Sequence, residues 1–183
     1  SAKDGGPWYA LKISAFRDGS FQTAVEVARG AQWVANWADT PHLFADGQGW
    51  LVAQWLQKSG KQTYAYDVML SQSSDGGKSW SQAFPAHDDA TASEHGFASF
   101  FPWHGAHGDP TATGTAGVGL VWLDGRQTVA EGPMTLRTAT LSPDGRWLEQ
   151  QALDLQVCDC CQTGASTSAT GPVVVYRDRT DSE

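Results

Sequence analysis

Ser73-Ser74-Asp75-Gly76-Gly77-Lys78-Ser79-Trp80 is a turn sequence between two runs with the composition of β-strands. Asp75 can cap the turn through hydrogen bonds from nearby backbone N–H groups, and Gly76 and Gly77 can adopt positive φ without a Cβ clash. Trp80 can anchor the following strand in an apolar layer. The stretch therefore predicts a hairpin, and it informs on architecture more than on chemistry because such a turn is structural.

The same kind of hairpin recurs along the chain. Strand-turn-strand patterns occupy residues 9–27, 63–84 and 134–153. Their turn aspartates lie 57 and 69 residues apart, at Asp18, Asp75 and Asp144. A repeat of this length built from paired strands predicts the four-stranded blades of a β-propeller.

Short apolar runs between the hairpins supply further strands. Residues 50–55, 118–124 and 172–178 each contain an apolar run that ends at an aromatic residue, which is typical of strands buried between stacked blades. The predicted fold is all-β, with about three blades of four-stranded antiparallel sheet. We divide it into an outer half-blade over 1–28, blades over 29–87 and 88–156, and an inner half-blade over 157–183.

Closure of such a fold needs more protein. Closed propellers usually contain at least four blades, so we expect the remaining blades, or a second chain, to cover the open edges. Alternating strand direction also sorts the loops between two ends. The connections that contain Asp39, residues 87–96 and the cysteines share one end, and the turns at Asp18 and Asp75 lie at the other.

Composition narrows the possible partners. The chain has 12 Lys and Arg against 20 Asp and Glu, a net charge of −8, and no basic stripe, so a nucleic-acid partner is not expected. No apolar run approaches the roughly 18 residues that a membrane-spanning helix needs.

The three cysteines, Cys158, Cys160 and Cys161, form one cluster. An odd number excludes complete internal pairing. A local disulfide would join Cys158 to Cys161, or less readily Cys160 to Cys161, because adjacent Cα atoms are closer than disulfide geometry prefers. Three thiolates could instead bind Cu or Zn, with His95 or His42 as a further ligand, and free thiols are the third alternative.

Two tryptophans in a predicted top loop, Trp33 and Trp37, are candidates for stacking on sugar rings, with simple packing as the alternative. Glu94 and His95 form an acid-base pair that could transfer protons or bind a metal. Asp124 follows a buried strand at the same end and joins His95 as a candidate ligand-binding residue.

Several motifs together resemble bacterial secreted proteins of the sialidase-like, or BNR-repeat, β-propeller family. The matching segments are Trp37-Ala38-Asp39-Thr40-Pro41, Glu94-His95-Gly96-Phe97, Trp122-Leu123-Asp124-Gly125-Arg126, the Cys-Asp-Cys-Cys stretch from Cys158, and Tyr176-Arg177-Asp178-Arg179. The turn described first resembles an Asp box, formed by Ser73, Asp75, Gly77, Ser79 and Trp80. The resemblance implies a six-bladed propeller when complete, and a secreted or periplasmic location.

The resemblance also implies candidate catalytic residues. Sialidases use three arginines to bind the substrate carboxylate. A tyrosine activated by a glutamate is the nucleophile, and an aspartate acts as acid or base. The positions available here are Arg126, Arg177 and Arg179, Tyr176 with Glu94 or Glu131, and Asp39. The expected function is presentation of a site for a glycan or other small anionic ligand. The alternatives are an exo-acting sialidase-type glycoside hydrolase and a protein that binds Cu or Zn through thiolates.

Overall fold

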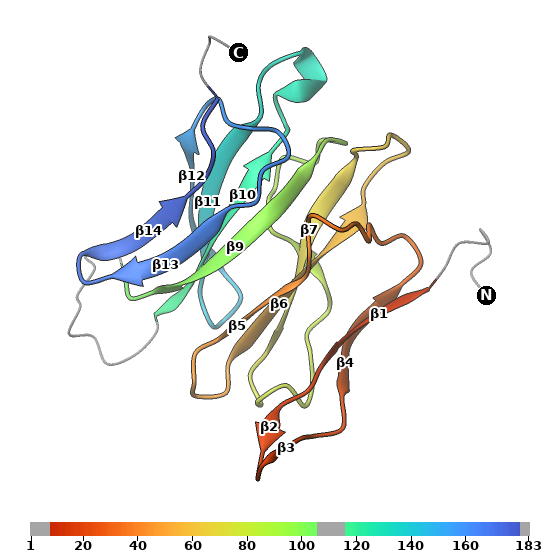
Figure 1. The fold of residues 1–183 in the computed structure, drawn as a ribbon, viewed down its shortest axis with the longest axis vertical. Coiled ribbons are helices and arrows are strands. Elements are labelled where there is room, and N and C mark those ends of the chain that lie inside the picture. Colours follow the sequence, from red (N-terminus) through yellow and green to blue (C-terminus); the bar gives the residue numbers. More distant parts are fainter. Residues whose placement is uncertain (1–7, 106–115, 180–183) are drawn as a thin grey trace.

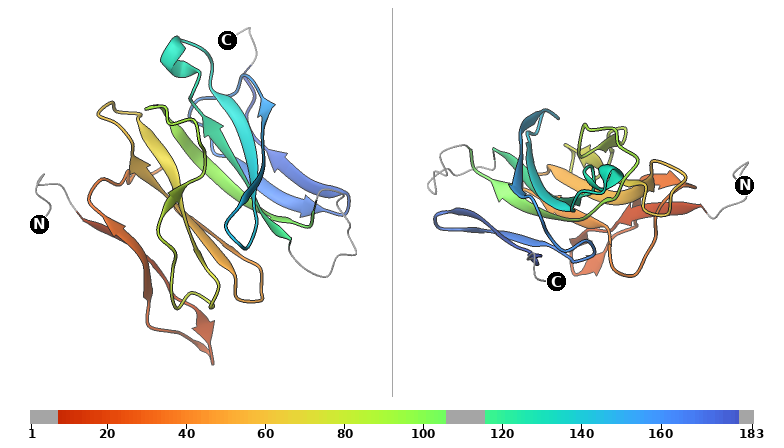
Figure 2. Two further views of the ribbon diagram at one scale, coloured as in Figure 1. Left: turned by 180° about the vertical axis from the view of Figure 1, so that it is seen from behind. Right: turned by 90° about the horizontal axis from the view of Figure 1, so that it is seen from above.

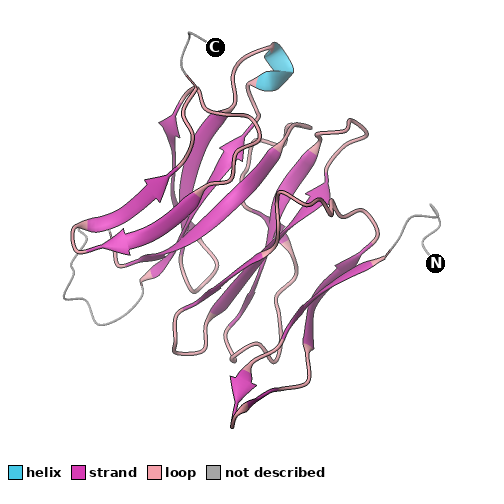
Figure 3. Ribbon diagram, in the orientation of Figure 1, coloured by secondary structure: helices cyan, strands magenta, loops and turns pink. Residues whose placement is uncertain are grey.

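The protein is built almost wholly from β-strands. The computed structural model describes residues 8–105 and 116–179. A single 3-10 turn, η1 (Thr128–Ala130), is the one helical element in that part of the chain (Figure 3). The all-β prediction is therefore confirmed. Within the same residues, no helix is long and apolar enough to cross a membrane.

Two four-stranded antiparallel sheets form the centre (Figure 1). The first contains, in order, β5 (His42–Ala45), β6 (Leu51–Lys58), β7 (Tyr66–Ser73) and β8 (Phe84–Pro85). The second contains, in order, β9 (His95–Trp103), β10 (Gly117–Asp124), β11 (Thr135–Leu141) and β12 (Trp147–Asp154). In both sheets, strands consecutive in the chain are neighbours, as in a propeller blade.

A strand pair flanks the centre on each side (Figure 2). At the N-terminal side, β1 (Tyr9–Ile13) pairs with β4 (Val25–Gly30). The chain that connects these two strands forms a small hairpin of β2 (Phe16–Arg17) and β3 (Ser20–Phe21). At the C-terminal side, β13 (Gly164–Ser168) pairs with β14 (Gly171–Val175) and lies along β9, where the Thr167 hydroxyl donates a 3.2 Å bond to the Pro102 carbonyl.

Apolar side chains of the two central sheets meet in one core. Val52 and Leu56 from β6, with Val68 from β7, face Leu120 and Trp122 from β10. Every residue of β10 is buried, as expected for a strand covered on both faces. Each fully buried aliphatic side chain contributes about 1.5–3 kcal/mol, more than a typical surface ion pair, so this core holds the two sheets together.

Strand register separates the loops into two groups. At one end, β6 pairs with β7 at Lys58–Tyr66, and at the other at Leu51–Ser73. We call the first the top end; it carries the connections 31–41, 59–65, 86–94, 125–134 and 155–163. The Val157 N–H bonds to the Met134 carbonyl there. At the opposite, bottom end, the Gly76 N–H bonds to the Gly49 carbonyl.

The Asp75 carboxylate organises its bottom turn. Its Oδ1 accepts bonds of 2.9 and 3.0 Å from the N–H groups of Lys78 and Ser79, and its Oδ2 accepts a 2.6 Å bond from the Ser79 hydroxyl. The Ser73 hydroxyl donates a further 2.8 Å bond to Oδ1. These donors stabilise the charged form and hold the pKa of Asp75 well below its usual range, because the bonds from Ser79 outweigh the slight effect of burial.

Candidate functional site

Asp39 reaches from the 31–41 connection to the start of β9. Its Oδ2 accepts a 2.6 Å hydrogen bond from the Phe97 N–H, and Phe97 has φ of 53°, an unusual value for a residue with a side chain. Gly96 makes the approach possible, since a Cβ there would overlap the Asp39 carboxylate. Asn36 Oδ1 accepts a 2.6 Å bond from the Asp39 N–H and fixes the loop.

Burial changes the acidity of Asp39. The residue is 4% exposed, and its Oδ1 is buried with no hydrogen-bond partner among the described residues. Burial raises the pKa of Asp39 to about 6, and the nearby charge of Glu94 adds to the rise against the bond from Phe97. Asp39 can therefore exchange a proton close to neutral pH.

Tyr66 and Glu94 form the second part of this group. The Tyr66 hydroxyl donates a short hydrogen bond to the Glu94 carboxylate, and the two residues also form an isolated parallel β-bridge. Burial raises the pKa of Glu94, and Asp159 raises it further, so the loop of the cysteines contributes to the electrostatics here. Three top connections thus bring carboxylates together around Gly96.

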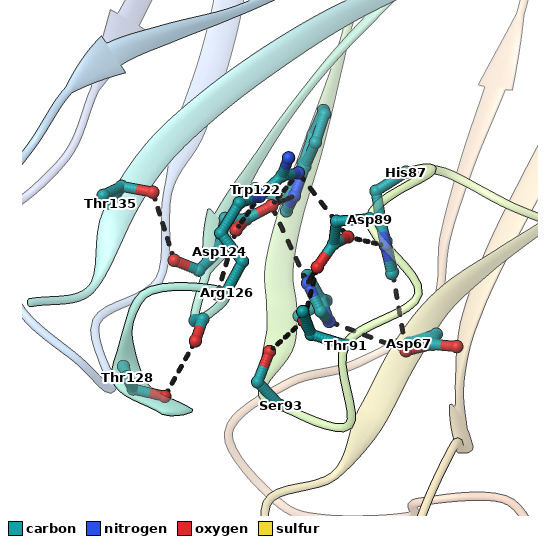
Figure 4. Close-up of polar contacts among 12 residues, drawn as sticks. Asp67, His87, Asp89, Thr91, Ser93, Trp122, Asp124, Arg126, Thr128 and Thr135 are labelled. Atoms are coloured by element: carbon teal, nitrogen blue, oxygen red, sulfur yellow. Dashed lines mark hydrogen bonds and ion pairs between the residues drawn. The ribbon is translucent and has the colours of Figure 1, made fainter. Parts of the chain in front are cut away.

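A cluster of buried histidines and aspartates lies next to this group (Figure 4). The side chains of His87 and His95 are 2% and 0% exposed, and their rings stack with centroids 3.6 Å apart. On one edge of the stack, Asp67 Oδ1 lies 3.5 Å from both His87 Nε2 and His95 Nδ1. On the other edge, Asp89 Oδ1 lies 2.6 Å from His87 Nδ1, and its Oδ2 lies 3.4 Å from His95 Nε2.

The surroundings keep these carboxylates ionised. Burial alone would raise the pKa of Asp89, but the Thr91 hydroxyl and the charges of His95, His87 and Arg126 lower it to about 2. The pKa of His95 is raised against the effect of burial by Asp67, Asp124 and Asp89. The cluster therefore favours positive charge between its carboxylates.

The three predicted arginines have separate surroundings. Arg126 makes a forked contact with Asp124, with Nε 2.7 Å from Oδ1, and a longer one with Asp89 at 3.6 Å. Arg179 pairs with Asp159 at 3.1 Å, while Arg177 lies by a surface recess lined by Cys160 and Cys161. Arg126 and Arg179 are thus already paired with carboxylates of the chain.

The other predicted site residues divide into buried and exposed positions. Tyr176 donates a 2.8 Å bond to Asp154, and Tyr66 is the tyrosine that contacts Glu94. Trp33 packs between Tyr9 and Trp55. Trp37 is 95% exposed at the top end, whereas His95 and Asp124 are fully buried, and Glu131 is an exposed residue after η1.

The cysteines adopt one of the arrangements considered. A disulfide joins Cys158 to Cys161, and Cys160 is free and exposed. Pairing removes two of the three thiolates that a Cu or Zn site would use, so such a site would require the reduced chain.

No protein-family model matches the chain, and no curated protein matches its sequence. Among solved structures, an alpha-L-arabinanase of Penicillium chrysogenum, determined in complex with arabinobiose, is similar with a TM-score of 0.58 and 15% identity. The match covers 92% of this chain and 49% of that one, so the chain spans about half of the arabinanase. The likeness establishes a partial β-propeller fold. It gives no support to the narrower sialidase-like family.

Sequence reasoning passed over Tyr66 and Asp67, and gave little weight to His87 and Asp89. Tyr66 and Asp67 open β7 at the same end as the start of β9. That position could have indicated that they lie near Glu94 and His95, because residues that begin alternate strands of a meander lie at the same end.

Proposed function

We propose that the chain is part of an extracytoplasmic, carbohydrate-active β-propeller whose top end binds a glycan. The proposal rests on the exposure of Trp37, which is 95% exposed on the same connection as Asp39. An exposed aromatic face is suited to stacking on a sugar ring, and neighbouring carboxylates can accept hydrogen bonds from sugar hydroxyls. Binding on loops over a rigid sheet scaffold is a common arrangement.

Three further observations support this proposal. The similar arabinanase was determined with arabinobiose, so a propeller of this shape can hold a saccharide. The Cys158–Cys161 disulfide suits an oxidising compartment such as the periplasm or the exterior. Strand β14 leaves Val175 70% exposed, which suits contact with further blades or a second chain.

The charge of the top end favours a neutral glycan over an anionic one. Glu94 raises the pKa of Asp39, Asp159 raises the pKa of Glu94, and Arg126 and Arg179 are already paired with aspartates. A substrate carboxylate would meet these like charges, and of the three predicted arginines only Arg177, exposed beside the cysteines, is left to offset them. We therefore rank a sialic acid below a neutral pentose or hexose unit.

Glycoside hydrolysis is the second candidate, and the acidity of Asp39 favours it. A carboxylic acid with a pKa of about 6 can donate a proton to a glycosidic oxygen near neutral pH. The Tyr66–Glu94 pair could supply the nucleophile, as the resemblance to sialidases implies for such a pair. Asp39 would be the proton donor.

Binding and hydrolysis can be tested separately. Titration with neutral oligosaccharides, followed by tryptophan fluorescence, should give saturable binding that Trp37→Ala weakens by about tenfold or more. Phe21→Ala, which removes a 73% exposed aromatic at the bottom end, is the matched control. Reducing-sugar release that is lost in Asp39→Asn, with binding retained, would establish the hydrolase. Equal binding by the wild type and Trp37→Ala would contradict the glycan site.

A further inference from the structure

We propose that Asp67, His87 and His95 form a binding site for a divalent transition metal of the zinc class. The three atoms that would bind the ion are Asp67 Oδ1, His87 Nε2 and His95 Nδ1. Each is buried and has no hydrogen-bond partner among the residues that the structure describes. All three lie within 4.8 Å of one another.

The protonation of the two histidines explains why these atoms face one another. Asp89 Oδ1 accepts a 2.6 Å hydrogen bond from His87 Nδ1, and its Oδ2 lies 3.4 Å from His95 Nε2, which has no hydrogen-bond partner among the described residues. A neutral imidazole carries one N–H, so the bond to Asp89 leaves a lone pair on His87 Nε2, and a neutral His95 with its N–H toward the Asp89 and Asp124 carboxylates has a lone pair on Nδ1. Two lone pairs and the Asp67 carboxylate oxygen then meet with no donor between them. A cation at that point would convert a repulsive arrangement into an attractive one.

Contacts from carboxylates to the ligand histidines are usual at metal sites. A histidine ligand commonly donates its other N–H to a carboxylate, which fixes the tautomer and the orientation of the ring. Asp89 does this for His87, and it is in turn held by the Thr91 hydroxyl and by Arg126. Asp124 lies 3.8 Å from His95 Nε2 and supports the same tautomer of His95.

The spacing of the donor atoms matches a small ion. Zinc bonds of about 2.0–2.1 Å place tetrahedral ligands about 3.4 Å apart. Asp67 Oδ1 lies 3.5 Å from each histidine nitrogen. The ring planes differ by only 14°, so binding requires one imidazole to tilt toward the ion. Two imidazoles and one carboxylate favour zinc-class metals over calcium and magnesium, which prefer oxygen ligands.

The local charge also favours a bound cation. Asp67, Asp89 and Asp124 are carboxylates, and Arg126 offsets the charge of one of the three. Asp89 has His87 and Thr91 as partners, but Asp67 Oδ1 is buried without a hydrogen-bond partner among the described residues, and a charge placed in this way is costly. A divalent ion would neutralise the two remaining charges, and so would two protons, one on each ring. The second solution would stack two imidazolium cations face to face, which disfavours it.

The proposed ion would join the two central sheets. Asp67 is the second residue of β7, His95 begins β9, and His87 lies in the connection between β8 and β9. Tyr66 and Glu94 immediately precede Asp67 and His95, so the ion would also fix the bridge that holds this pair. The site does not depend on the proposed glycan function.

Metal content gives the direct test. The full chain, purified without a histidine tag or chelator and then dialysed against micromolar ZnSO4, should retain about one equivalent of zinc. Saturating zinc should raise its Tm by about 5–10 °C over the chelator-treated protein. Asp67→Asn and His87→Gln should lose the ion, whereas Asp88→Asn, which changes an exposed neighbour, should keep it.

The cysteine cluster needs its own control, because among the described residues it is the group of metal-ligating side chains that shares no member with the proposed site. Cys160→Ser should retain the ion. Cobalt substitution should give a visible spectrum without a thiolate charge-transfer band, which distinguishes nitrogen and oxygen ligands from sulfur. The spectrum is recorded on the wild-type chain, so it remains informative even if Asp67→Asn does not fold. The proposal fails if wild-type protein retains no metal and zinc leaves its Tm unchanged, or if Cys160→Ser abolishes binding.

Discussion

The Tyr66 hydroxyl is bonded to the Glu94 carboxylate, and the backbones of the same two residues form a bridge between β7 and the segment that leads into β9. Tyr66 is 4% exposed, and its N–H also bonds to the Ser93 carbonyl at 3.1 Å. Side chains and backbone therefore join the two central sheets at one point of the top end. The pair positions Glu94 near Asp39, where the charge of Glu94 adds to the rise in the pKa of Asp39 that burial causes.

Replacing Tyr66 by phenylalanine should remove the donor and leave the half-buried Glu94 carboxylate without it. Hydrogen bonds to charged groups contribute about 1.5–3 kcal/mol, so Tyr66→Phe should lower the free energy of unfolding at pH 7 by about that amount. Urea denaturation measures the change. Tyr64→Phe, at a 65% exposed tyrosine two residues earlier, should have no effect. Equal stabilities of the two variants would contradict the role of this bond.

The sequence was sufficient to predict the class of fold. Strand composition, turn chemistry at Asp75 and the buried run over 118–124 are local features, and local features predict strands and hairpins well. Asp39, Glu94 and the cysteines could be assigned to one end because strand direction alternates along a meander. Neither argument requires knowledge of how two sheets pack together.

Side-chain pairing across sheets was beyond prediction. Tyr176 was predicted to pair with Glu94 or Glu131, but Tyr66 is the tyrosine bonded to Glu94, and Tyr176 bonds to Asp154. Alternation along a strand fixes the face of a residue, whereas the pairing depends on the stagger between β7 and β9. His87 and Asp67 are 20 residues apart in sequence and meet through the pairing of β7 with β8, which continues in the bond from the Ala86 N–H to the Val68 carbonyl.

Alkylation can determine the state of the cysteines. With Cys158 and Cys161 joined, iodoacetamide should modify only Cys160 in unreduced, denatured protein, and all three cysteines after reduction. Mass spectrometry of the intact chain and of its peptides gives the count and the positions. Cys160→Ser should show no modification before reduction. Modification of all three without reductant would exclude the disulfide.

Asp75 should stabilise the chain in its ionised form. Its pKa is lowered in the folded state, so this contribution is present above about pH 4 and is lost as the pH falls through the unfolded value toward the folded one. Asp75→Asn should therefore lower the Tm by several degrees at pH 7, with a deficit that shrinks below pH 4. Asp18→Asn provides a matched control in another bottom turn, where an asparagine tolerates the φ of 51°. A deficit of constant size across this range would exclude the electrostatic origin.

The pH dependence of the stability that Asp39 contributes should have the opposite sign. Its pKa is about 6 in the folded chain against about 3.9 in an unfolded one, so folding favours the protonated carboxyl. The stability that it contributes is complete below about pH 4 and is lost as the pH rises to 6, by about 3 kcal/mol for a difference of two pKa units. Asp39→Asn cannot ionise, and its amide oxygen can still accept from Phe97.

The measurement is urea denaturation of both proteins between pH 4 and pH 7. Relative to the wild type, Asp39→Asn should become progressively more stable as the pH rises from 4 to 6, and the difference should then level off. Taking the difference between the two proteins removes the effect of Asp67 and Asp89, whose lowered pKa values act in both. Asp88→Asn, at an exposed position, should show a constant difference. A constant difference between Asp39→Asn and the wild type would mean that the Asp39 carboxyl is ionised throughout this pH range. It could not then serve as a proton donor near neutral pH.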